Sequence, residues 1–384
     1  MNILIIHNIY SKIGGEEKVV EFQKQLLESK GHNVIVYYRN YNEMNSWLFG
    51  KIGGLFTSIF NSRSIKDVKK IIKDFNPHIS ILHNLFPIIS PAIINLLKSK
   101  RVIIYQIVHN YRLLCPTGIF FSKGNICEKC TKGLREWNCL INNCTQNYFA
   151  SFSFSLRGFL VRKLKYYNSV DLFLTISDFL RNILINNGFS EEKVITLSNA
   201  YIDSKGKDNE IEIKNKKFIG FVGRLTIEKG ILDFIQIARN MPEFEFRVAG
   251  QVNCLIESIE IPKNLEFVGF LDDNSLDKFY NSCRVLLVLS KWYEPFGMVI
   301  LESLFSNTPV IVNDIGAMSQ IIEDGKEGFV VEIGDLDLVE KRIGELFVSD
   351  EKYSQICYNC RKKVEDKFSS DLYYSRLMQI HHDI

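Results

Sequence analysis

The chain has 384 residues, of which 46% are hydrophobic and 24% are charged. This balance is typical of a folded soluble protein and excludes a largely disordered chain, and the length suggests two or three domains. The net charge is only +3, yet residues 1–200 contain 25 basic and 13 acidic side chains, whereas residues 201–384 contain 22 and 31. The asymmetry indicates that the first half faces an anionic partner, such as a lipid headgroup, a phosphate ester or nucleic acid.

The first apolar run has no basic leader before it, so we expect no signal peptide. We also expect no transmembrane helix, because prolines, histidines and asparagines interrupt the longest stretch without acidic or basic residues, 75–97. Nine cysteines in a chain without a secretory signal favour reduced thiols or a metal site over a disulfide scaffold. These features together predict a cytoplasmic protein.

The first half of the chain alternates short apolar runs with helical patterns. The first run is followed by Gly14-Gly15 and by a helix that ends near Gly31. Buried strands that alternate with helices are typical of a parallel sheet covered on both faces, so we predict one doubly wound α/β domain over residues 1–200. Its predicted strands are 2–7, 33–38, 79–83, 102–109, 171–177 and 194–199.

Residues 201–217 are polar and contain no apolar run, which predicts a linker. A second α/β domain is predicted over residues 218–369, followed by a C-terminal helix over 370–384 that returns to the first domain. Two such domains would face each other across a cleft, and doubly wound sheets bind ligands at the carboxyl ends of their strands. The strands predicted in the second domain are 218–223, 244–249, 265–270, 285–290, 309–313 and 329–333.

Two basic residues, Arg224 and Lys229, follow the first strand of the second domain, in a turn flanked by Gly223 and Gly230. Two cations five residues apart in a glycine-flanked turn suit a diphosphate. The alternative is a solvated turn with two surface cations, and the spacing alone does not decide between them.

Two acidic residues, Glu294 and Glu302, follow the strand predicted at 285–290. Gly297 marks the expected start of a helix, where free backbone N–H groups attract a phosphate. Glu294 lies before this helix and Glu302 lies on it, so both carboxylates suit the hydroxyl groups of a ribose or hexose. The alternative is a capping glutamate and an exposed helix glutamate.

Two further motifs resemble ligand sites less closely. Gly14-Gly15 follows the first strand without the G-x-G-x-x-G spacing of a nicotinamide or flavin site, although two glycines still allow a phosphate to approach the backbone. Asp335-Leu-Asp337 matches the Asp-x-Asp pattern of metal-dependent transferases. Because it follows Gly334 and precedes a helical pattern, we interpret it as a helix cap and expect no metal in catalysis.

Taken together, these motifs resemble those of glycosyltransferase family 4, which are retaining enzymes of the GT-B type with two Rossmann-like domains. The second domain contributes the Arg224–Lys229 turn and the E-x7-E element from Glu294 to Glu302. The first domain is similar to one branch of the family, with a cysteine cluster after an H-N-x-R-x-x-C-P motif. That similarity rests on His7-Asn8, Gly14-Gly15-Glu16-Glu17, His83-Asn84 and the segment from His109 to Pro116.

The resemblance implies a role for each matching residue. Arg224 and Lys229 would bind the diphosphate of a nucleotide sugar, Glu302 its ribose and Glu294 the transferred sugar. His109 would contact the sugar near the reacting carbon, unless it is a core histidine bonded to backbone. The implied catalytic residues are His109, Arg224, Lys229 and Glu294, and the implied donor-binding residues are Gly14, Gly15, Arg224, Lys229, Glu294, Phe296, Gly297, Met298, Val299 and Glu302.

The chemistry implied is transfer of a hexose-type sugar with retention. The departing nucleoside diphosphate gains negative charge, which the two cations and the helix N-terminus would stabilise. The acceptor would attack from the side of the leaving group, and a phosphate oxygen would take its proton. No catalytic cofactor is expected beyond the nucleotide-sugar substrate.

Five cysteines lie between residues 115 and 144, and Cys127-Glu-Lys-Cys130 has the spacing of a zinc knuckle. We expect a structural zinc ion in an insertion at about 112–147. The alternative is a set of free thiols in a cysteine-rich loop. The favoured zinc ligands are Cys115, Cys127, Cys130 and Cys144, with Cys139 left over.

Two stretches of the basic half, 47–60 and 148–167, combine aromatic or aliphatic residues with basic residues inside or just after them. They fit helices that lie on an anionic membrane surface, and an ordinary core helix with a basic face fits them equally. A membrane location predicts a glycan or polyprenyl-diphosphate-linked acceptor at the cytoplasmic face of the plasma membrane. This location suits surface polysaccharide biosynthesis.

Four other functions compete with this interpretation. A nucleotide-sugar epimerase or a phosphorylase could use the same architecture, and a phosphorylase would need a lysine-bound pyridoxal phosphate. A zinc-dependent nucleic-acid-binding protein could use the cysteines and the basic half of the chain. That function would not explain the motifs formed by Arg224, Lys229, Glu294 and Glu302. A nucleotide-sugar-binding protein without catalysis is separated from a transferase only by turnover.

Overall fold

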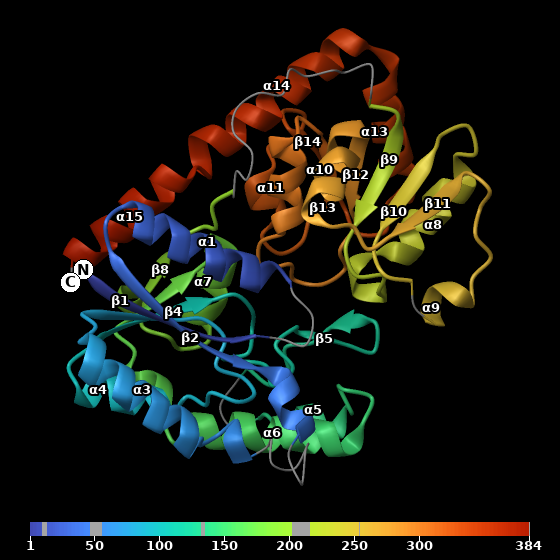
Figure 1. Cartoon of the computed structure of the whole chain (residues 1–384). Coiled ribbons are helices and arrows are strands. Elements are labelled where there is room, and N and C mark those ends of the chain that lie inside the picture. The colour runs from blue at the N-terminus through green and yellow to red at the C-terminus, as the bar shows by residue number, and fades with distance from the viewer. Residues whose placement is uncertain (10–13, 47–55, 132–134, 202–215, 253, 384) are drawn as a thin grey trace. The chain divides into compact units, whose positions relative to one another are not determined.

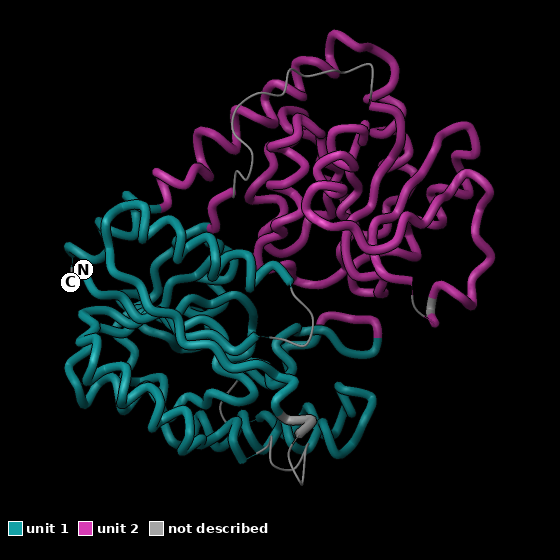
Figure 2. The backbone as a smooth tube through the Cα atoms, in the orientation of Figure 1, with its two compact units in different colours: residues 1–123, 127–198, 374–384 teal, residues 124–126, 199–373 magenta. Residues whose placement is uncertain are grey.

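The computed structural model describes all residues except 10–13, 47–55, 132–134, 202–215, 253 and 384 (Figure 1). It divides into two compact units, which Figure 2 shows in different colours. Unit 1 comprises residues 1–123, 127–198 and 374–384, and unit 2 comprises residues 124–126 and 199–373. Most of the predicted linker at 201–217 and of the predicted apolar stretch at 47–60 lies outside the described residues.

Unit 1 is built, in its described part, on a six-stranded parallel sheet with the order β2-β1-β3-β4-β7-β8. The strands are mostly aliphatic because helices exclude water from both faces, and all four residues of β3 are buried. All six strands predicted for the first half are confirmed. They are β1 (Asn2–Ile9), β2 (Asn33–Asn40), β3 (Ile79–Leu82), β4 (Ile103–Val108), β7 (Leu172–Thr175) and β8 (Val194–Thr196).

Helices cover both faces of this sheet, with α1 on one face and α3 and α4 on the other (Figure 1). Several begin at capping side chains: the Asn147 side chain accepts from the Ala150 N–H at the start of α6. The helices of unit 1 are α1 (Gly15–Ser29), α3 (Ser62–Phe75), α4 (Ala92–Ser99), α5 (Asn138–Ile141), α6 (Tyr148–Lys163) and α7 (Asp178–Asn186), with 3-10 helices η1 (Tyr41–Ser46), η2 (Tyr166–Ser169) and η3 (Glu191–Lys193).

Unit 2 contains, among the described residues, a second six-stranded parallel sheet with the order β11-β10-β9-β12-β13-β14. The chain adds strands outward in one direction from β9 and then in the other direction from β12. The strands predicted for the second half are all present. They are β9 (Phe218–Val222), β10 (Phe246–Ala249), β11 (Leu265–Gly269), β12 (Cys283–Val288), β13 (Val310–Asn313) and β14 (Gly328–Val331).

In unit 2, as in unit 1, several helices begin at a capping side chain. The Asp335 carboxylate accepts from the Leu338 N–H at 3.0 Å, so the interpretation of Asp335-Leu-Asp337 as a helix cap is confirmed. The helices are η5 (Ile227–Lys229), α8 (Ile231–Asn240), α9 (Cys254–Glu257), α10 (Asp273–Ser282), α11 (Met298–Phe305), α12 (Met318–Ile321), α13 (Leu336–Val348) and α14 (Asp350–Lys367).

The last helix, α15 (Ser370–His382), ends the chain, and its residues from 374 onward group with unit 1. There the Tyr374 hydroxyl lies 2.9 Å from His32 Nε2, and His381 Nδ1 lies 2.9 Å from the Tyr105 hydroxyl. The predicted α/β class with two parallel sheets is confirmed. The sequence did not predict the short hairpin of β5 (Phe121–Ser122) and β6 (Asn125–Ile126). Within the described residues, no helix is long and apolar enough to span a membrane.

A buried arginine, Arg284, links the sheet of unit 2 to the helices α13 and α14. Arg284 in β12 is 6% exposed and donates twice to the Leu346 carbonyl, at 3.0 and 2.8 Å. It also donates to Asp350 at 3.0 Å and lies 3.6 Å from the centre of the Tyr353 ring. The guanidinium charge is therefore matched by a carbonyl, a carboxylate and an aromatic face.

We expect Arg284→Met to lower the free energy of unfolding by about 2–3 kcal/mol, because the buried Leu346 carbonyl loses its charged donor. The midpoint of urea-induced unfolding measures this change. The control is Arg247→Met, since Arg247 is partly exposed and forms surface pairs with Glu245 and Glu266. That variant should lose less than about 1 kcal/mol. Equal midpoints for the two variants would contradict the role given to Arg284.

Candidate functional site

The carboxyl edge of the unit 2 sheet brings two of the predicted clusters together. β9 and β12 are neighbours in the sheet, and the strand order reverses between them. In doubly wound sheets, ligands bind beyond the carboxyl ends of the strands at such a switch point. The chain after β9 carries Lys229, and the chain after β12 carries Glu294, so these two residues flank the position where a ligand is expected.

Glu294 and Lys229 form a close ion pair at this edge. Lys229 Nζ lies 2.5 Å from Glu294 Oε2. The same oxygen accepts from the Trp292 indole N–H at 3.0 Å and from the Ser290 hydroxyl at 3.2 Å. Glu294 is 7% exposed, whereas the Lys229 side chain is 22% exposed. The carboxylate is thus fixed by three donors, while part of the lysine side chain stays open to a ligand.

Two glycines allow neighbouring backbone segments to pack closely against the loop that follows β12 and carries Glu294. Gly230 has a φ of +78°, and a Cβ built on it would lie 2.0 Å from the Leu289 carbonyl oxygen. Gly316 has a φ of +66°, and its Cβ would lie 2.5 Å from the backbone N and O of Glu294. A side chain at either position would displace the loop that carries Glu294, so glycine is required here for space as well as for conformation.

The N-terminus of α11 lies directly after this loop. The helix starts after Gly297, which has a φ of +96°, and no side chain caps it. Its first residues, Met298 and Val299, are half-buried, and Phe296 is buried edge-on against Phe368 at a centroid distance of 5.9 Å. An uncapped helix N-terminus presents backbone N–H groups and a positive dipole end, which suit an anion.

Arg224 and Glu302, which were also predicted to bind the donor, each contact another side chain of the protein. The Arg224 side chain is 63% exposed and lies 3.6 Å from Glu228. Glu302, on α11, accepts from the Tyr280 hydroxyl at 2.8 Å. Burial, reinforced by Glu302, raises the pKa of Tyr280 well above its ordinary value, which keeps this hydroxyl a donor. The predicted contacts of Arg224 with a diphosphate and of Glu302 with a ribose stay predictions.

In unit 1, three histidines meet at the carboxyl edge of the sheet. His7 lies in β1, His83 follows β3 and His109 follows β4. His83 Nδ1 lies 2.8 Å from His109 Nε2, and His83 Nε2 lies 2.9 Å from the Gln23 amide oxygen. The two rings stack at a centroid distance of 5.1 Å, and the ring of His7 lies edge-on to that of His83.

This arrangement fixes the protons on both rings. An amide oxygen can only accept, so the N–H of His83 is at Nε2 and its Nδ1 accepts from His109 Nε2. His109 Nδ1 is then the unprotonated nitrogen, able to accept from a ligand hydroxyl. Burial, with His7 as the next cause, lowers the pKa of His109 to about 3. Burial, with His109 as the next cause, also lowers the pKa of His83 well below its usual value.

The predicted glycines Gly14 and Gly15 lie at the start of α1, beside the histidines. Gly14 is the N-cap residue, and its N–H donates to Glu17 Oε2 at 2.8 Å. The other oxygen of Glu17 lies 3.7 Å from His7 Nε2. Glu16 accepts from the Asn110 side chain at 3.0 Å, and burial raises the pKa of this carboxyl. The glycine motif and the histidines therefore occupy one edge of unit 1.

The cysteine-rich insertion places its thiols near one another. Burial raises the pKa of Cys130 to about 12, and the nearby thiols of Cys115, Cys144 and Cys127 add to the shift. A hydrogen bond from Cys139 lowers the pKa of Cys144 to about 6. Across the part of the chain that the structure describes, no group of three or more His, Cys, Asp or Glu side chains has the geometry of a metal site. The zinc site at Cys115, Cys127, Cys130 and Cys144 therefore stays a prediction.

The second half of the chain matches a known family. Residues 203–363 match the family model described as "Glycosyl transferases group 1". A 42.6 kDa protein in the cps region of Klebsiella pneumoniae, described as uncharacterized, is 26% identical over 93% of this chain and 99% of its own length. The Staphylococcus aureus protein CapM, a capsular polysaccharide biosynthesis glycosyltransferase, is 28% identical over 57% of this chain and 63% of its own length. These matches support a glycosyltransferase of group 1.

Solved structures agree with the fold of this chain. The structure of Anabaena HepE in complex with UDP-glucose is similar over 100% of both chains, with a TM-score of 0.68 and 16% identity. Such a likeness concerns the fold alone, and the GT-B fold expected from the sequence is confirmed.

The candidate site includes residues that were not predicted as site residues: Gln23, His83, Ser290 and Trp292. Gln23 is fully buried in the apolar stripe of α1, among Val19, Val20, Leu26 and Leu27. A polar residue at a helix position whose neighbours at i−4 and i+3 are apolar was a visible signal for a buried hydrogen bond. His83 belonged to a quoted motif, but only the fold shows that it touches His109.

We expect the free energy of unfolding to fall as the pH drops from about 6.5 towards 4. Histidines in the unfolded chain bind protons near pH 6.5, whereas native His109 and His83 stay neutral until far lower pH, so acid favours the unfolded state. One such group contributes a slope of about 1.4 kcal/mol per pH unit in this window. Urea unfolding at a series of pH values, followed by fluorescence, measures the slope.

The variant His109→Gln should reduce that slope, because one neutral buried histidine is removed. His382→Gln, at an exposed position in α15, is the matched control and should keep the wild-type slope. An unchanged slope in His109→Gln would show that His109 is not held neutral in the native protein.

Proposed function

We propose that this protein is a retaining glycosyltransferase that transfers a hexose-type sugar from a nucleotide sugar to a glycan or lipid-linked acceptor in polysaccharide biosynthesis. The observation that carries the proposal is the Lys229–Glu294 pair at the switch point of unit 2, next to the uncapped N-terminus of α11. The capsular role of CapM and the UDP-glucose bound to HepE support the same class of donor and product.

In the proposed mechanism, unit 2 binds the donor and stabilises its leaving group. The diphosphate accepts from Lys229 and from the first backbone N–H groups of α11, so its growing charge is offset as the glycosidic bond breaks. Arg224 reaches the outer phosphate oxygens, and Glu302 binds the ribose. Glu294 accepts from hydroxyl groups of the sugar, and the Trp292 and Ser290 donors hold its carboxylate in place.

Unit 1 supplies a neutral acceptor near the reacting carbon. His109 Nδ1 accepts from a sugar hydroxyl, because its Nε2–H is already donated to His83. A neutral imidazole leaves the positive charge that develops at the anomeric carbon unopposed by a second cation. The acceptor hydroxyl attacks from the leaving-group side and passes its proton to a phosphate oxygen, so the configuration is retained without a carboxylate nucleophile.

We expect Lys229→Met to lower kcat about 100- to 1,000-fold, because one preorganised cation on the leaving group is removed. Transfer from a radiolabelled nucleotide sugar to membranes or oligosaccharide acceptors measures the rate, and NMR of the product shows whether the anomeric configuration is retained. The variant should bind the nucleoside diphosphate more weakly, seen as a smaller rise in Tm.

The matched control is Lys291→Met. Lys291 also follows β12 and pairs with a carboxylate, but its partner is Asp233 of α8, at 2.8 Å. This variant should keep nearly wild-type transfer. Full activity of Lys229→Met would refute the assigned donor site, and an inverted product would refute the retaining mechanism.

We also propose that unit 1 binds an anionic membrane surface through α5 and α6. Large apolar side chains there are exposed: Ile141 by 75%, Tyr148 by 69% and Phe149 by 48%. Basic residues, among them Lys163 and Lys165, follow at the end of the same helix. The helix thus combines exposed aromatic groups at its start with cations at its end, and segments that contain both kinds of group are typical of the boundary of anionic lipids.

The expected result is that the protein cosediments with vesicles containing phosphatidylglycerol and much less with pure phosphatidylcholine vesicles. Phe149→Ser should reduce cosedimentation, since it removes a large exposed apolar group. Tyr358→Ser, at a position 55% exposed on α14 of unit 2, is the control and should change nothing. Equal binding of the wild type to both vesicle types would contradict the proposal.

A further inference from the structure

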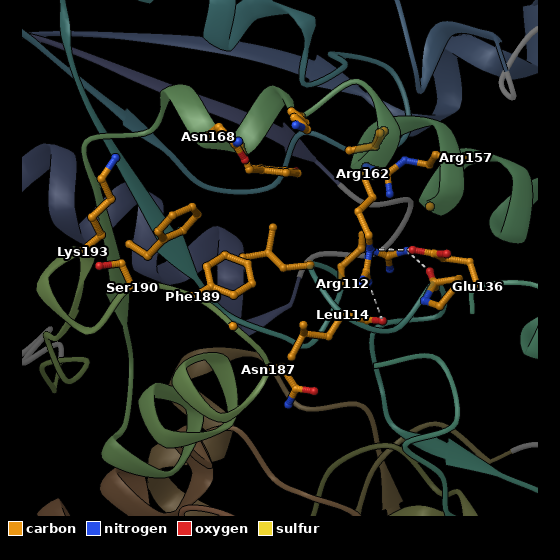
Figure 3. Close-up of a pocket in the computed structure, with 18 residues that line it drawn as sticks. Arg112, Leu114, Glu136, Arg157, Arg162, Asn168, Asn187, Phe189, Ser190 and Lys193 are labelled. Carbon is orange, nitrogen blue, oxygen red and sulfur yellow. Dashed lines mark hydrogen bonds and ion pairs between the residues drawn. The ribbon is translucent and has the colours of Figure 1, made fainter. Parts of the chain in front are cut away.

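Unit 1 contains a cavity of about 450 Å³ that none of the roles above uses (Figure 3). The loop after β4, the helix α6 and the turn between α7 and β8 enclose it. Its volume lies within the range of small-ligand pockets. The cavity is therefore large enough to bind part of a substrate.

One end of the cavity is rich in guanidinium groups. Figure 3 shows Arg112, Arg157, Arg162 and Glu136 gathered at this end. Among the described residues that line the cavity, Glu136 is the single acid. It is 1% exposed and lies 2.6 Å from Arg162 Nε. The described lining of the cavity therefore contains more basic than acidic side chains at this end, although Arg112 also interacts with the buried carboxylate of Glu16.

Two of these arginines are held firmly. Arg112 donates to the Pro116 carbonyl at 3.0 Å, and its guanidinium lies 4.5 Å from the centre of the Phe86 ring. The guanidinium of Arg157, a residue that is 4% exposed, lies 4.7 Å from the centre of the same ring. Burying cations is costly unless anions offset them. Two preorganised guanidinium groups beside an open cavity suit a phosphate, which accepts two N–H donors from each arginine.

The rest of the cavity is lined by both apolar and polar side chains, and the polar ones include Lys165, Asn168 and Asn187. Val161, Phe173 and Phe189 line it, and Phe189 lies between the arginines and the opposite end, where Lys193 and Ser190 are found (Figure 3). The Lys193 ammonium donates to the Val170 carbonyl at 3.2 Å. A ligand in this space can place an anionic group on the arginines and an aliphatic chain along Val161, Phe173 and Phe189.

The cavity also adjoins the histidine cluster. A smaller cavity of about 40 Å³ is lined by His83, His109 and Asn110. It shares Arg112, Arg157 and Tyr167 with the larger one. An anion held by the two arginines would therefore lie next to the residue that is proposed to act at the reacting carbon.

We infer that this cavity binds the phosphate-bearing end of an amphipathic acceptor, namely an aliphatic phosphate or diphosphate ester. The phosphate lies on Arg112 and Arg157, and the first part of the aliphatic chain lies along Val161, Phe173 and Phe189. The inference rests on the proposed function, since it names the class of acceptor for the same transfer reaction.

Calorimetric titration of the full-length protein tests the inference with three probes: farnesyl diphosphate, inorganic diphosphate and farnesol. Farnesyl diphosphate should bind at least about tenfold more tightly than either of the others, because it alone offers both the anion and the aliphatic chain. Equal affinities for the two diphosphates would assign the cavity to the phosphate of a water-soluble ligand and overturn the inference. Absence of binding by farnesyl diphosphate would overturn it as well.

Two variants locate the binding. Arg157→Gln should weaken binding of both diphosphates at least about tenfold. Val161→Phe fills the apolar part and should weaken binding of farnesyl diphosphate alone, so it remains informative if Arg157→Gln fails to fold. Lys100→Gln is the matched control, because Lys100 is an exposed cation of unit 1 outside the cavity. Farnesyl diphosphate binding that is unchanged in Val161→Phe would place it elsewhere and refute the inference.

Binding of UDP, with and without Lys229→Met, separates this test from that of the donor site. UDP binding that depends on Lys229, together with no binding of farnesyl diphosphate, would refute the inference and leave the proposed function standing. If the wild-type protein does not bind UDP, the proposed donor site is refuted instead.

Discussion

The contact between Lys229 and Glu294 is the interaction on which the donor side depends. It joins two loops that are 65 residues apart in the sequence, and it forms only because β9 and β12 are neighbours in the sheet. Gly230 lets the Lys229 loop lie against the backbone of Leu289, and Gly316 lets the segment after β13 lie against the backbone of Glu294; a Cβ at either position would collide. The strand order thus brings the two loops together, and Gly230 allows their backbones to lie close to each other.

In unit 1, hydrogen bonds and burial together determine where the histidine side chains carry their protons. The chain of hydrogen bonds from Gln23 to His83 and on to His109 decides which nitrogen of His109 is free. Both imidazoles are neutral because desolvation disfavours the charged form. Unit 2 achieves the opposite effect with Glu294, where three donors stabilise a buried negative charge. The two units therefore offer a neutral acceptor and an anion held beside a cation.

The sequence predicted the fold well because buried parallel strands leave a strong signal. Each of the twelve predicted apolar runs contains a strand, since a strand covered on both faces needs apolar residues at nearly every position. The two-residue strands of the β5–β6 hairpin carry no such signal. The Lys229 and Glu294 loops were predicted because the carboxyl ends of strands are the usual binding positions. The stacking of His83 on His109 and the three donors on Glu294 depend on tertiary contacts, which a single sequence does not contain.

Buried arginines in this protein show how structural and binding roles differ. Arg284 and the arginines at the unit 1 cavity are all held by carbonyl groups or aromatic rings, so burial alone does not separate them. The difference lies in charge balance and space. Arg284 has a carboxylate of its own in Asp350, whereas Arg112, Arg157 and Arg162 border a volume of about 450 Å³ whose described lining includes one acid, Glu136, and Glu136 pairs with Arg162. A buried cation whose balance is complete stabilises the fold. A cluster with surplus charge beside a cavity lowers its electrostatic energy when an anion binds, and this free energy becomes available for substrate affinity.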